Sequence, residues 1–149
     1  MFRSYLAFGD SAGALRMIEA QLTKNPDSVP ALNNQAALFI QSGRAAAAIP
    51  VLNRALALTN VPSIQLNRAI AQMQLRNLDA AEKDYRQLTN APVDQFSVHY
   101  GLSQIAEQRH DSNAAISHLE FCLTNAPAGG AKWQEISARL NTLGKSKAN

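Results

Sequence analysis

An alanine recurs along this chain at a nearly constant interval. The copies are Ala14, Ala48, Ala81 and Ala115, which are separated by 34, 33 and 34 residues. A period of this size predicts a repeat protein in which each copy packs mainly on its neighbours. Because such an array is a rod with no catalytic pocket by construction, the sequence predicts a non-enzymatic binding module.

Two further positions keep the same phase as the alanines. Four residues after each alanine stands a bulky apolar or aromatic residue: Ile18, Leu52, Tyr85 and Leu119. Twelve residues before it stands a mostly small residue: Phe2, Ala36, Ala69 and Ser103. Three positions in phase over four copies indicate one unit that is repeated along almost the whole chain.

Each copy predicts two amphipathic helices joined by a tight turn. In the second copy Leu32, Ala36 and Phe39 recur at helical spacing, and Gly43 then interrupts the pattern. The turn falls seven residues after the small residue, at Gly9, Gly43, Arg76 and His110. Glycine suits a left-handed residue that closes a helix, and we expect a modest strain where arginine and histidine replace it. The alternative is that the following Asn77 or Asp111 shifts the turn.

Composition argues against several classes of protein. The 149 residues are 46% hydrophobic and carry a net charge of +3, but the cations come singly and are interleaved with acids. The sequence therefore argues against nucleic-acid binding, which needs a stripe of cations. There is neither a run of eighteen apolar residues nor a signal-peptide pattern at the start. A cytoplasmic location is slightly favoured, although a targeting signal could lie outside this segment.

Candidate metal ligands are few. They are His99, His110, His118 and Cys122. Although His118 and Cys122 lie one helical turn apart, no second pair has ligand spacing, and we predict no metal and no cofactor. Cys122 is expected to be a buried packing group. The acidic residues Asp79, Glu82 and Asp84 are expected to be solvated charges on a second helix.

The last segment differs from the repeats. After a Gly129-Gly130 pair, a helix over 131–143 places Trp133, Ile136, Leu140 and Leu143 on one stripe. An array leaves a hydrophobic side exposed at its end, so this helix is predicted to cap it. Residues 145–149 are expected to be a disordered tail.

The pattern resembles the tetratricopeptide repeat family, which has W-x2-L-G-x2-Y, then A-x3-F, then P over 34 residues. Leu32-x2-Gln35-Ala36-x2-Phe39 followed by Ala48-x3-Leu52 is similar to this pattern, and the third copy has a family-like Leu66-Asn67-Arg68-Ala69. The resemblance implies an all-α fold, a right-handed superhelical array of antiparallel helix hairpins. It implies one domain over 1–144, with repeats at 1–28, 29–61, 62–95 and 96–128.

The helix over 63–75 has two possible registers. Without a gap, Gln65, Arg68 and Gln72 occupy slots that are usually apolar. A slip of one residue would instead seat Leu66, Ala69, Ile70 and Met73 in the core. We adopt the ungapped register, and the alternative stays open on sequence alone.

In this family the first helices of the repeats line a concave groove that usually holds an extended peptide or a partner helix. The resemblance places these residues in the groove: Asn33, Asn34, Ala37, Gln41, Leu66, Asn67, Ile70, Met73, Gln74, Tyr100, Gln104 and Gln108. Asn34 and Asn67 have equal offsets, as do Gln41, Gln74 and Gln108, and a primary amide can both donate to and accept from a peptide backbone. The alternative is that these amides are simply tolerated on exposed helix surfaces.

Some members of the family grip a terminal carboxylate with lysine and arginine. At the corresponding positions this chain has Asn33, Asn67, Ser97 and Gly101, so the cations are missing. We therefore expect a neutral or modestly polar ligand, such as an amphipathic helix or the hydrophobic side chains of a peptide.

The first repeat is short. Its first helix should begin before Met1, so only Phe2, Tyr5, Leu6 and Phe8 remain of the apolar face. Either the chain is a segment of a longer repeat protein, or this aromatic end docks on a second copy to form a homo-oligomer. Self-association is thus the alternative to ligand binding.

Overall fold

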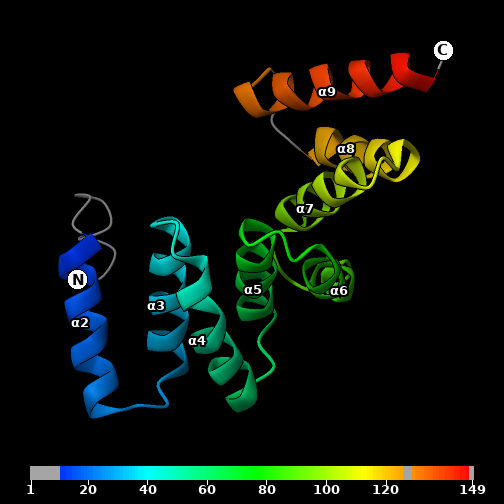
Figure 1. The fold of residues 1–149 in the computed structure, drawn as a ribbon. Coiled ribbons are helices and arrows are strands. Elements are labelled where there is room, and N and C mark those ends of the chain that lie inside the picture. Colours follow the sequence, from blue (N-terminus) through cyan, green and yellow to red (C-terminus); the bar gives the residue numbers. More distant parts are fainter. Residues whose placement is uncertain (1–10, 126–128, 148–149) are drawn as a thin grey trace. The chain divides into compact units, whose positions relative to one another are not determined.

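The computed structural model describes residues 11–125 and 129–147. Eight α-helices and no strand occupy this part of the chain (Figure 1). The helices are α2 (Ser11–Lys24), α3 (Val29–Gln41), α4 (Ala45–Leu58), α5 (Pro62–Gln74), α6 (Leu78–Leu88), α7 (Gln95–Gln108), α8 (Ser112–Asn125) and α9 (Ala131–Lys147). The all-α prediction is confirmed.

The chain divides into two compact units, residues 1–81 and residues 82–149. The sequence predicted one domain over 1–144. A division of this kind is compatible with a repeat architecture, because each hairpin gains its contacts from its neighbours and no central core ties distant repeats together.

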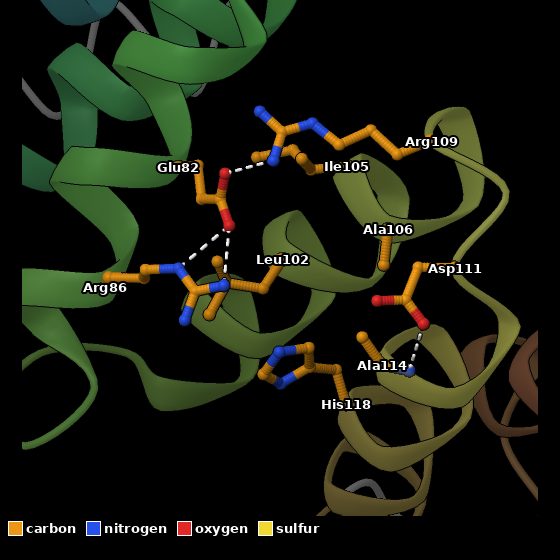
Figure 2. A pocket seen from close by; sticks show the side chains of 9 residues that line it. All are labelled: Glu82, Arg86, Leu102, Ile105, Ala106, Arg109, Asp111, Ala114 and His118. Atoms are coloured by element: carbon orange, nitrogen blue, oxygen red, sulfur yellow. Dashed lines mark hydrogen bonds and ion pairs between the residues drawn. The ribbon is translucent and has the colours of Figure 1, made fainter.

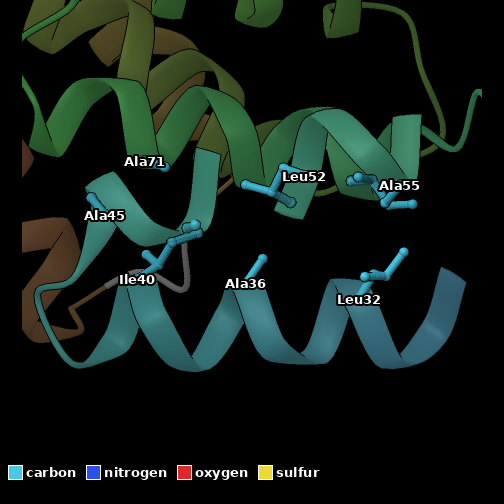
Figure 3. Packing of buried hydrophobic residues seen from close by; sticks show 9 residues of the cluster. Leu32, Ala36, Ile40, Ala45, Leu52, Ala55 and Ala71 are labelled. Atoms are coloured by element: carbon cyan, nitrogen blue, oxygen red, sulfur yellow. The ribbon is translucent and has the colours of Figure 1, made fainter. Parts of the chain in front are cut away.

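In the first unit α3 packs against α2, α4 and α5. Its core is a cluster of small and branched apolar side chains from three of these helices (Figure 3). Leu32, Ala36 and Ile40 of α3 point toward Leu52 and Ala55 of α4. Alanines at the contacts let the helix backbones approach closely, and the leucines and isoleucines fill the space between them.

The positions that define the sequence period are the buried positions of the structure. Ala14, Ala48, Ala81 and Ala115 are all fully buried, and the bulky residue four positions later is buried in every copy. Among the described small residues, Ala36, Ala69 and Ser103 are also fully buried. The predicted period is therefore confirmed as a packing period.

Three helices end in the same hydrogen-bonded turn. The closing residues Gly43, Arg76 and His110 have φ values of 72°, 59° and 60°. At each turn the amide of this residue donates to the carbonyl three residues back, and the next amide donates to the carbonyl five residues back. This is the Schellman arrangement, which satisfies carbonyls at the end of a helix. The prediction that Arg76 and His110 adopt a glycine-like backbone is confirmed.

These turns support the ungapped register for α5. Arg76 follows the fully buried Ala69 by seven residues, as Gly43 follows Ala36 in the copy before. Ile70 and Met73, which a slipped register would place in the core, are only half-buried. Gln72 stands at the position of the tyrosine in the W-x2-L-G-x2-Y pattern. Its side-chain oxygen is buried and has no hydrogen-bond partner among the described residues.

In the second unit α8 packs against α7 on one side and α9 on the other. Tyr85 of α6 fills the space beside Gly101 of α7, where a Cβ atom would lie 2.6 Å from the Tyr85 ring carbon Cε2. Ile136 of α9 is buried against Leu119 and Cys122, as expected of a capping helix. A glycine in the middle of α7 is thus explained by the aromatic side chain that packs on it.

The capping helix is longer than the sequence predicted. It continues from Ala131 to Lys147, through part of the segment 145–149 that was assigned to a disordered tail. No proline follows Leu143 to end the helix, and Gly144 costs only about 1 kcal/mol relative to alanine. The aromatic end, Phe2 to Phe8, lies outside the described residues.

Candidate functional site

Two first helices of adjacent repeats, α3 and α5, contact each other in the first unit. The side-chain amide of Asn67 donates to the side-chain oxygen of Asn33 over 2.8 Å. At the end of α5, the amide of Gln74 donates to the main-chain carbonyl of Ile40 over 3.3 Å. Each bond spans 34 residues of sequence. The structure therefore brings Asn33 and Asn67 together, and it bonds Asn67 to Asn33 and not to Asn34.

The other predicted groove residues of this unit form a partly covered surface. Asn34 and Ala37 of α3 are half-buried, and Gln41 is exposed. The apolar residues Leu66, Ile70 and Met73 of α5 are all half-buried. We call the surface formed by the predicted groove residues of α3 and α5 the amide surface: Asn33, Asn34, Ala37, Gln41, Leu66, Asn67, Ile70, Met73 and Gln74.

The amide surface carries no ionised side chain. The sequence of α3 contains no charged residue, and that of α5 contains only Arg68. The guanidinium of Arg68 donates to the side-chain oxygen of Asn53 on α4 over 3.0 Å. The hydrogen-bonding groups that the amide surface offers are therefore neutral.

In the second unit the predicted groove residue Tyr100 is engaged by the capping helix. Its hydroxyl donates to Oε1 of Glu135 over 2.6 Å, and Nζ of Lys132 lies 4.0 Å from the centre of its ring. The ring also stacks with Phe96 at 5.9 Å between centres. Of the other two candidates on α7, Gln104 is half-buried and Gln108 is exposed.

Charged groups therefore surround the α7 candidates, in contrast to the amide surface. Hydrogen bonds from Tyr100 and Lys132 lower the pKa of Glu135. Although partial burial acts in the opposite direction, hydrogen bonds to Tyr100 and Glu135 raise the pKa of Lys132. Arg139 also pairs with Glu107 of α7. These contacts attach α9 to α7 through ion pairs as well as through the apolar core.

A small pocket of about 100 Å³ lies between α6, α7 and α8 (Figure 2). Figure 2 shows the carboxylate of Glu82 between the guanidinium groups of Arg86 and Arg109, both of which it accepts hydrogen bonds from. Burial alone would raise the pKa of Glu82, but these two partners hold it below its ordinary value. The interpretation of Glu82 as a solvated charge is therefore wrong, because the arginines of two helices converge on it.

Asp84 was expected to be solvated and is instead 2% exposed. The buried face of α6 contains Ala81, Tyr85 and Leu88, and Asp84 lies three residues after Ala81 on the same face. Asp79, in the first turn of α6, is exposed as predicted. Whether an acidic residue of α6 is buried or exposed thus depends on its face of the helix, and not on the number of acidic residues nearby.

Two histidines that are 19 residues apart meet between α7 and α8. The Nδ1 atoms of His99 and His118 lie 3.1 Å apart, and the His99 ring stacks on Phe121 at 3.7 Å between centres. Cys122 is fully buried, and its thiol contacts the carbonyl oxygen of Phe96 at 3.7 Å. Burial raises the pKa of this thiol to about 11. The prediction that Cys122 is a buried packing group is confirmed.

The histidine pair and the Glu82 ion pairs were not predicted from the sequence. The histidine pair could have been found from the geometry of a helix hairpin. Residues at similar distances from the α7–α8 turn at Arg109–Asp111 face each other across the two antiparallel helices. His99 precedes this turn by about ten residues and His118 follows it by about seven. Searching for ligand spacing within one helix cannot detect such a pair.

Within residues 11–125 and 129–147, no helix is long and apolar enough to cross a membrane. The chain matches no curated protein. Solved structures give clearer similarities. The crystal structure of MamA is 15% identical, covers 99% of this chain and 95% of its own, and has a TM-score of 0.75.

Two other solved proteins show the same fold. TTC0263, a thermophilic tetratricopeptide repeat protein of Thermus thermophilus, is 16% identical over 95% of this chain and 77% of its own, with a TM-score of 0.72. The hetero-tetramer Cut9–Hcn1 of the APC/C has a chain that is 20% identical over 95% of this chain and 28% of its own, with a TM-score of 0.76. A family model described as tetratricopeptide repeat matches residues 1–62 and 66–128, and the chain therefore belongs to the tetratricopeptide repeat family.

Proposed function

We propose that this chain is a non-catalytic scaffold that binds a protein or peptide through the first helices of its repeats. Tetratricopeptide folds suggest protein partners, and the family and the similar structures are generally non-catalytic scaffolds. The observation that carries the proposal is the amide surface, where two such helices present neutral hydrogen-bonding groups beside half-buried apolar side chains.

The chemistry of this surface favours a ligand without a charged anchor. A primary amide offers two N–H groups and an acceptor oxygen, and the bond to Asn33 uses only one N–H group of Asn67. Asn34 and Gln41 make no side-chain hydrogen bond within the described part of the chain. A peptide backbone could bond to these amides while its apolar side chains cover Leu66, Ile70 and Met73.

Site-specific crosslinking followed by titration tests this proposal. A photoreactive residue at Met73 should crosslink a partner that the same residue at the exposed Asn53 of α4 does not crosslink. The identified partner is then titrated against Asn34→Ala combined with Asn67→Ala. We expect the affinity to fall by about 1–3 kcal/mol, because buried hydrogen bonds are lost.

The control variant is Asn60→Ala, which removes an exposed amide outside α3 and α5. It should bind with the affinity of the wild type. An unchanged Kd in the double variant would contradict the role of the amides.

Self-association through Phe2, Tyr5, Leu6 and Phe8 stays the alternative function. It predicts a concentration-dependent dimer in sedimentation that Tyr5→Glu abolishes. A monomer at all concentrations would exclude this alternative and would leave ligand binding as the proposed function.

A further inference from the structure

The meeting of His99 and His118 is a chemical feature that peptide binding does not use. The two side chains lie on the facing sides of the α7–α8 hairpin, with 3.1 Å between their Nδ1 atoms. We propose that His99 and His118 together bind one divalent transition-metal ion of the kind that prefers imidazole, such as Zn²⁺, Ni²⁺ or Cu²⁺, through their Nδ1 atoms.

The separation of the two nitrogens suits such an ion. Zinc binds imidazole nitrogen at about 2.0–2.1 Å, and two bonds of this length at an angle between a right angle and the tetrahedral angle place the nitrogens about 2.9–3.4 Å apart. The observed 3.1 Å falls inside this range. Little movement of the helices is therefore needed for both nitrogens to reach one ion.

The protonation state of the pair also suits a metal. Burial lowers the pKa of both histidines, and for His118 the charges of His99 and Arg86 lower it further. These shifts favour the neutral form of both imidazoles. In a neutral imidazole one nitrogen carries the proton and the other has a free lone pair. With both protons on Nε2, the two Nδ1 atoms carry free lone pairs 3.1 Å apart.

The rings are held in position before any ion binds. The His99 ring stacks on Phe121 with an angle of 15° between the planes, and it meets the His118 ring at 64°. Both residues belong to helices that pack closely around the buried Leu119. A preorganised pair loses less entropy on binding than two flexible surface histidines.

Within the described residues, His99 and His118 are the two ligands that the protein supplies. In the part of the chain that the structure describes, no group of three or more histidine, cysteine or acidic side chains could hold a metal ion. Cys122 lies one helical turn from His118, but its thiol contacts the carbonyl of Phe96 and its raised pKa disfavours the thiolate. Water must fill the remaining positions. The expected order of affinity therefore follows imidazole preference, with Cu²⁺ above Ni²⁺ and Zn²⁺.

The charged groups near the histidine pair lower its affinity for a metal cation, but they do not prevent binding. Arg86 of α6 repels a cation near His118, but its guanidinium is paired with Glu82 over 2.7 Å. His118 and both of these residues line the small pocket of Figure 2, together with Arg109 and Asp111. Because two acidic groups oppose two arginines there, the pocket has no large net charge.

Calorimetric titration of the purified full chain with NiCl₂ and with ZnCl₂ at neutral pH tests the proposal. We expect one ion per chain, and we expect His99→Gln and His118→Gln each to weaken binding by about tenfold or more. The matched control is His110→Gln, since His110 is exposed at the turn of the same hairpin. Its affinity should equal that of the wild type, and Cys122→Ser should also retain binding.

Nuclear magnetic resonance provides a second measurement that needs no variant. Zn²⁺ should shift the ring signals of His99 and His118 at lower concentration than those of His110. The absence of binding, or binding that survives both substitutions, would overturn the proposal and would leave the pair as an imidazole–imidazole hydrogen bond.

Discussion

The two units of this chain share the same periodic buried positions, which we call the repeat frame, but the side chains between those positions differ in their chemistry. In residues 1–81 the packed helices α3 and α5 meet through neutral amides, and the amide surface that they form has no ionised group. In residues 82–149 the helices meet through ion pairs and charge-assisted hydrogen bonds, such as the ion pair of Glu82 with Arg109 and the hydrogen bond from Tyr100 to Glu135. The frame positions are nevertheless buried in both units.

This difference shows which positions fix the fold and which are free to vary. Leu52 and Leu119 occupy the same place in their repeats, and both are fully buried. Between such positions, the first unit has Asn33 and Asn67 where the second has Tyr100 and Gly101. Repeat proteins can change their surface in this way because each surface position contacts few residues outside its own and adjacent repeats.

The largest expected effect comes from truncating the shared frame positions. Leu52→Ala and Leu119→Ala should each destabilise the chain by about 2–5 kcal/mol, because each leaves a cavity in a closed core. Hydrogen exchange should show faster opening of α3, α4 and α5 in the first variant and of α7, α8 and α9 in the second. Equal loss of protection throughout the chain in both variants would show that the two units unfold as one.

A smaller loss of stability is expected from a substitution at Gly101, which stands in the second unit where the first unit has Asn67. A methyl group there would lie 2.8 Å from the hydroxyl oxygen of Tyr85, which is buried. Gly101→Ala should therefore cost about 1–3 kcal/mol through overpacking. Tyr85→Leu in the same chain should recover part of this loss, and a thermal unfolding cycle of the four variants measures the coupling. Additive effects would show that the ring moves aside without cost.

How much of this could be predicted depends on the kind of contact. The period of the alanines was sufficient to predict the buried positions of each repeat, because local helix packing determines those positions. The turns at Arg76 and His110 followed from their equal offset with Gly43. The pairs His99–His118 and Glu82–Arg109 could not be predicted in this way, because they depend on the rotation of helices about their axes.

The amide surface was predicted in part. The resemblance placed Asn33, Asn34 and Asn67 in the groove, and equal offsets related Asn67 to Asn34. In the structure the side chain of Asn67 bonds to Asn33. A shift of one residue turns a side chain by about 100° around a helix. A pattern of spacings alone cannot fix the partner of a polar side chain at that precision.

The helix-ending turns offer a direct comparison between the units at lower energy. Arg76→Gly in the first unit and His110→Gly in the second should each stabilise the chain by about 0.5–1 kcal/mol, because relief of the left-handed backbone strain exceeds the extra freedom that glycine gives the unfolded chain. Gly43→Ala should have the opposite sign, since it introduces the same strain where the space is open. Chemical denaturation measures all three, and a destabilising Arg76→Gly would indicate that its side chain contributes more than its backbone costs.

A comparably small effect concerns acid stability, which should differ between the units through Glu82. Its pKa is lowered in the folded chain, so its ion pairs stabilise the fold above the ordinary pKa near 4.5, and this stabilisation is lost as the pH falls through the lowered value. Glu82→Gln should therefore cost about 0.5–1 kcal/mol at pH 7, as expected of a partly exposed ion pair, and nothing once the pH is below the lowered value. The control is Glu120→Gln, which removes an exposed carboxylate of α8 in the same unit. The free energy of unfolding of Glu82→Gln is compared with that of the wild type at each pH. If this difference stays constant as the carboxylate is titrated, the ionised form of Glu82 does not stabilise the second unit through the two arginines. The apolar packing of that unit would then account for its stability without the charged contacts.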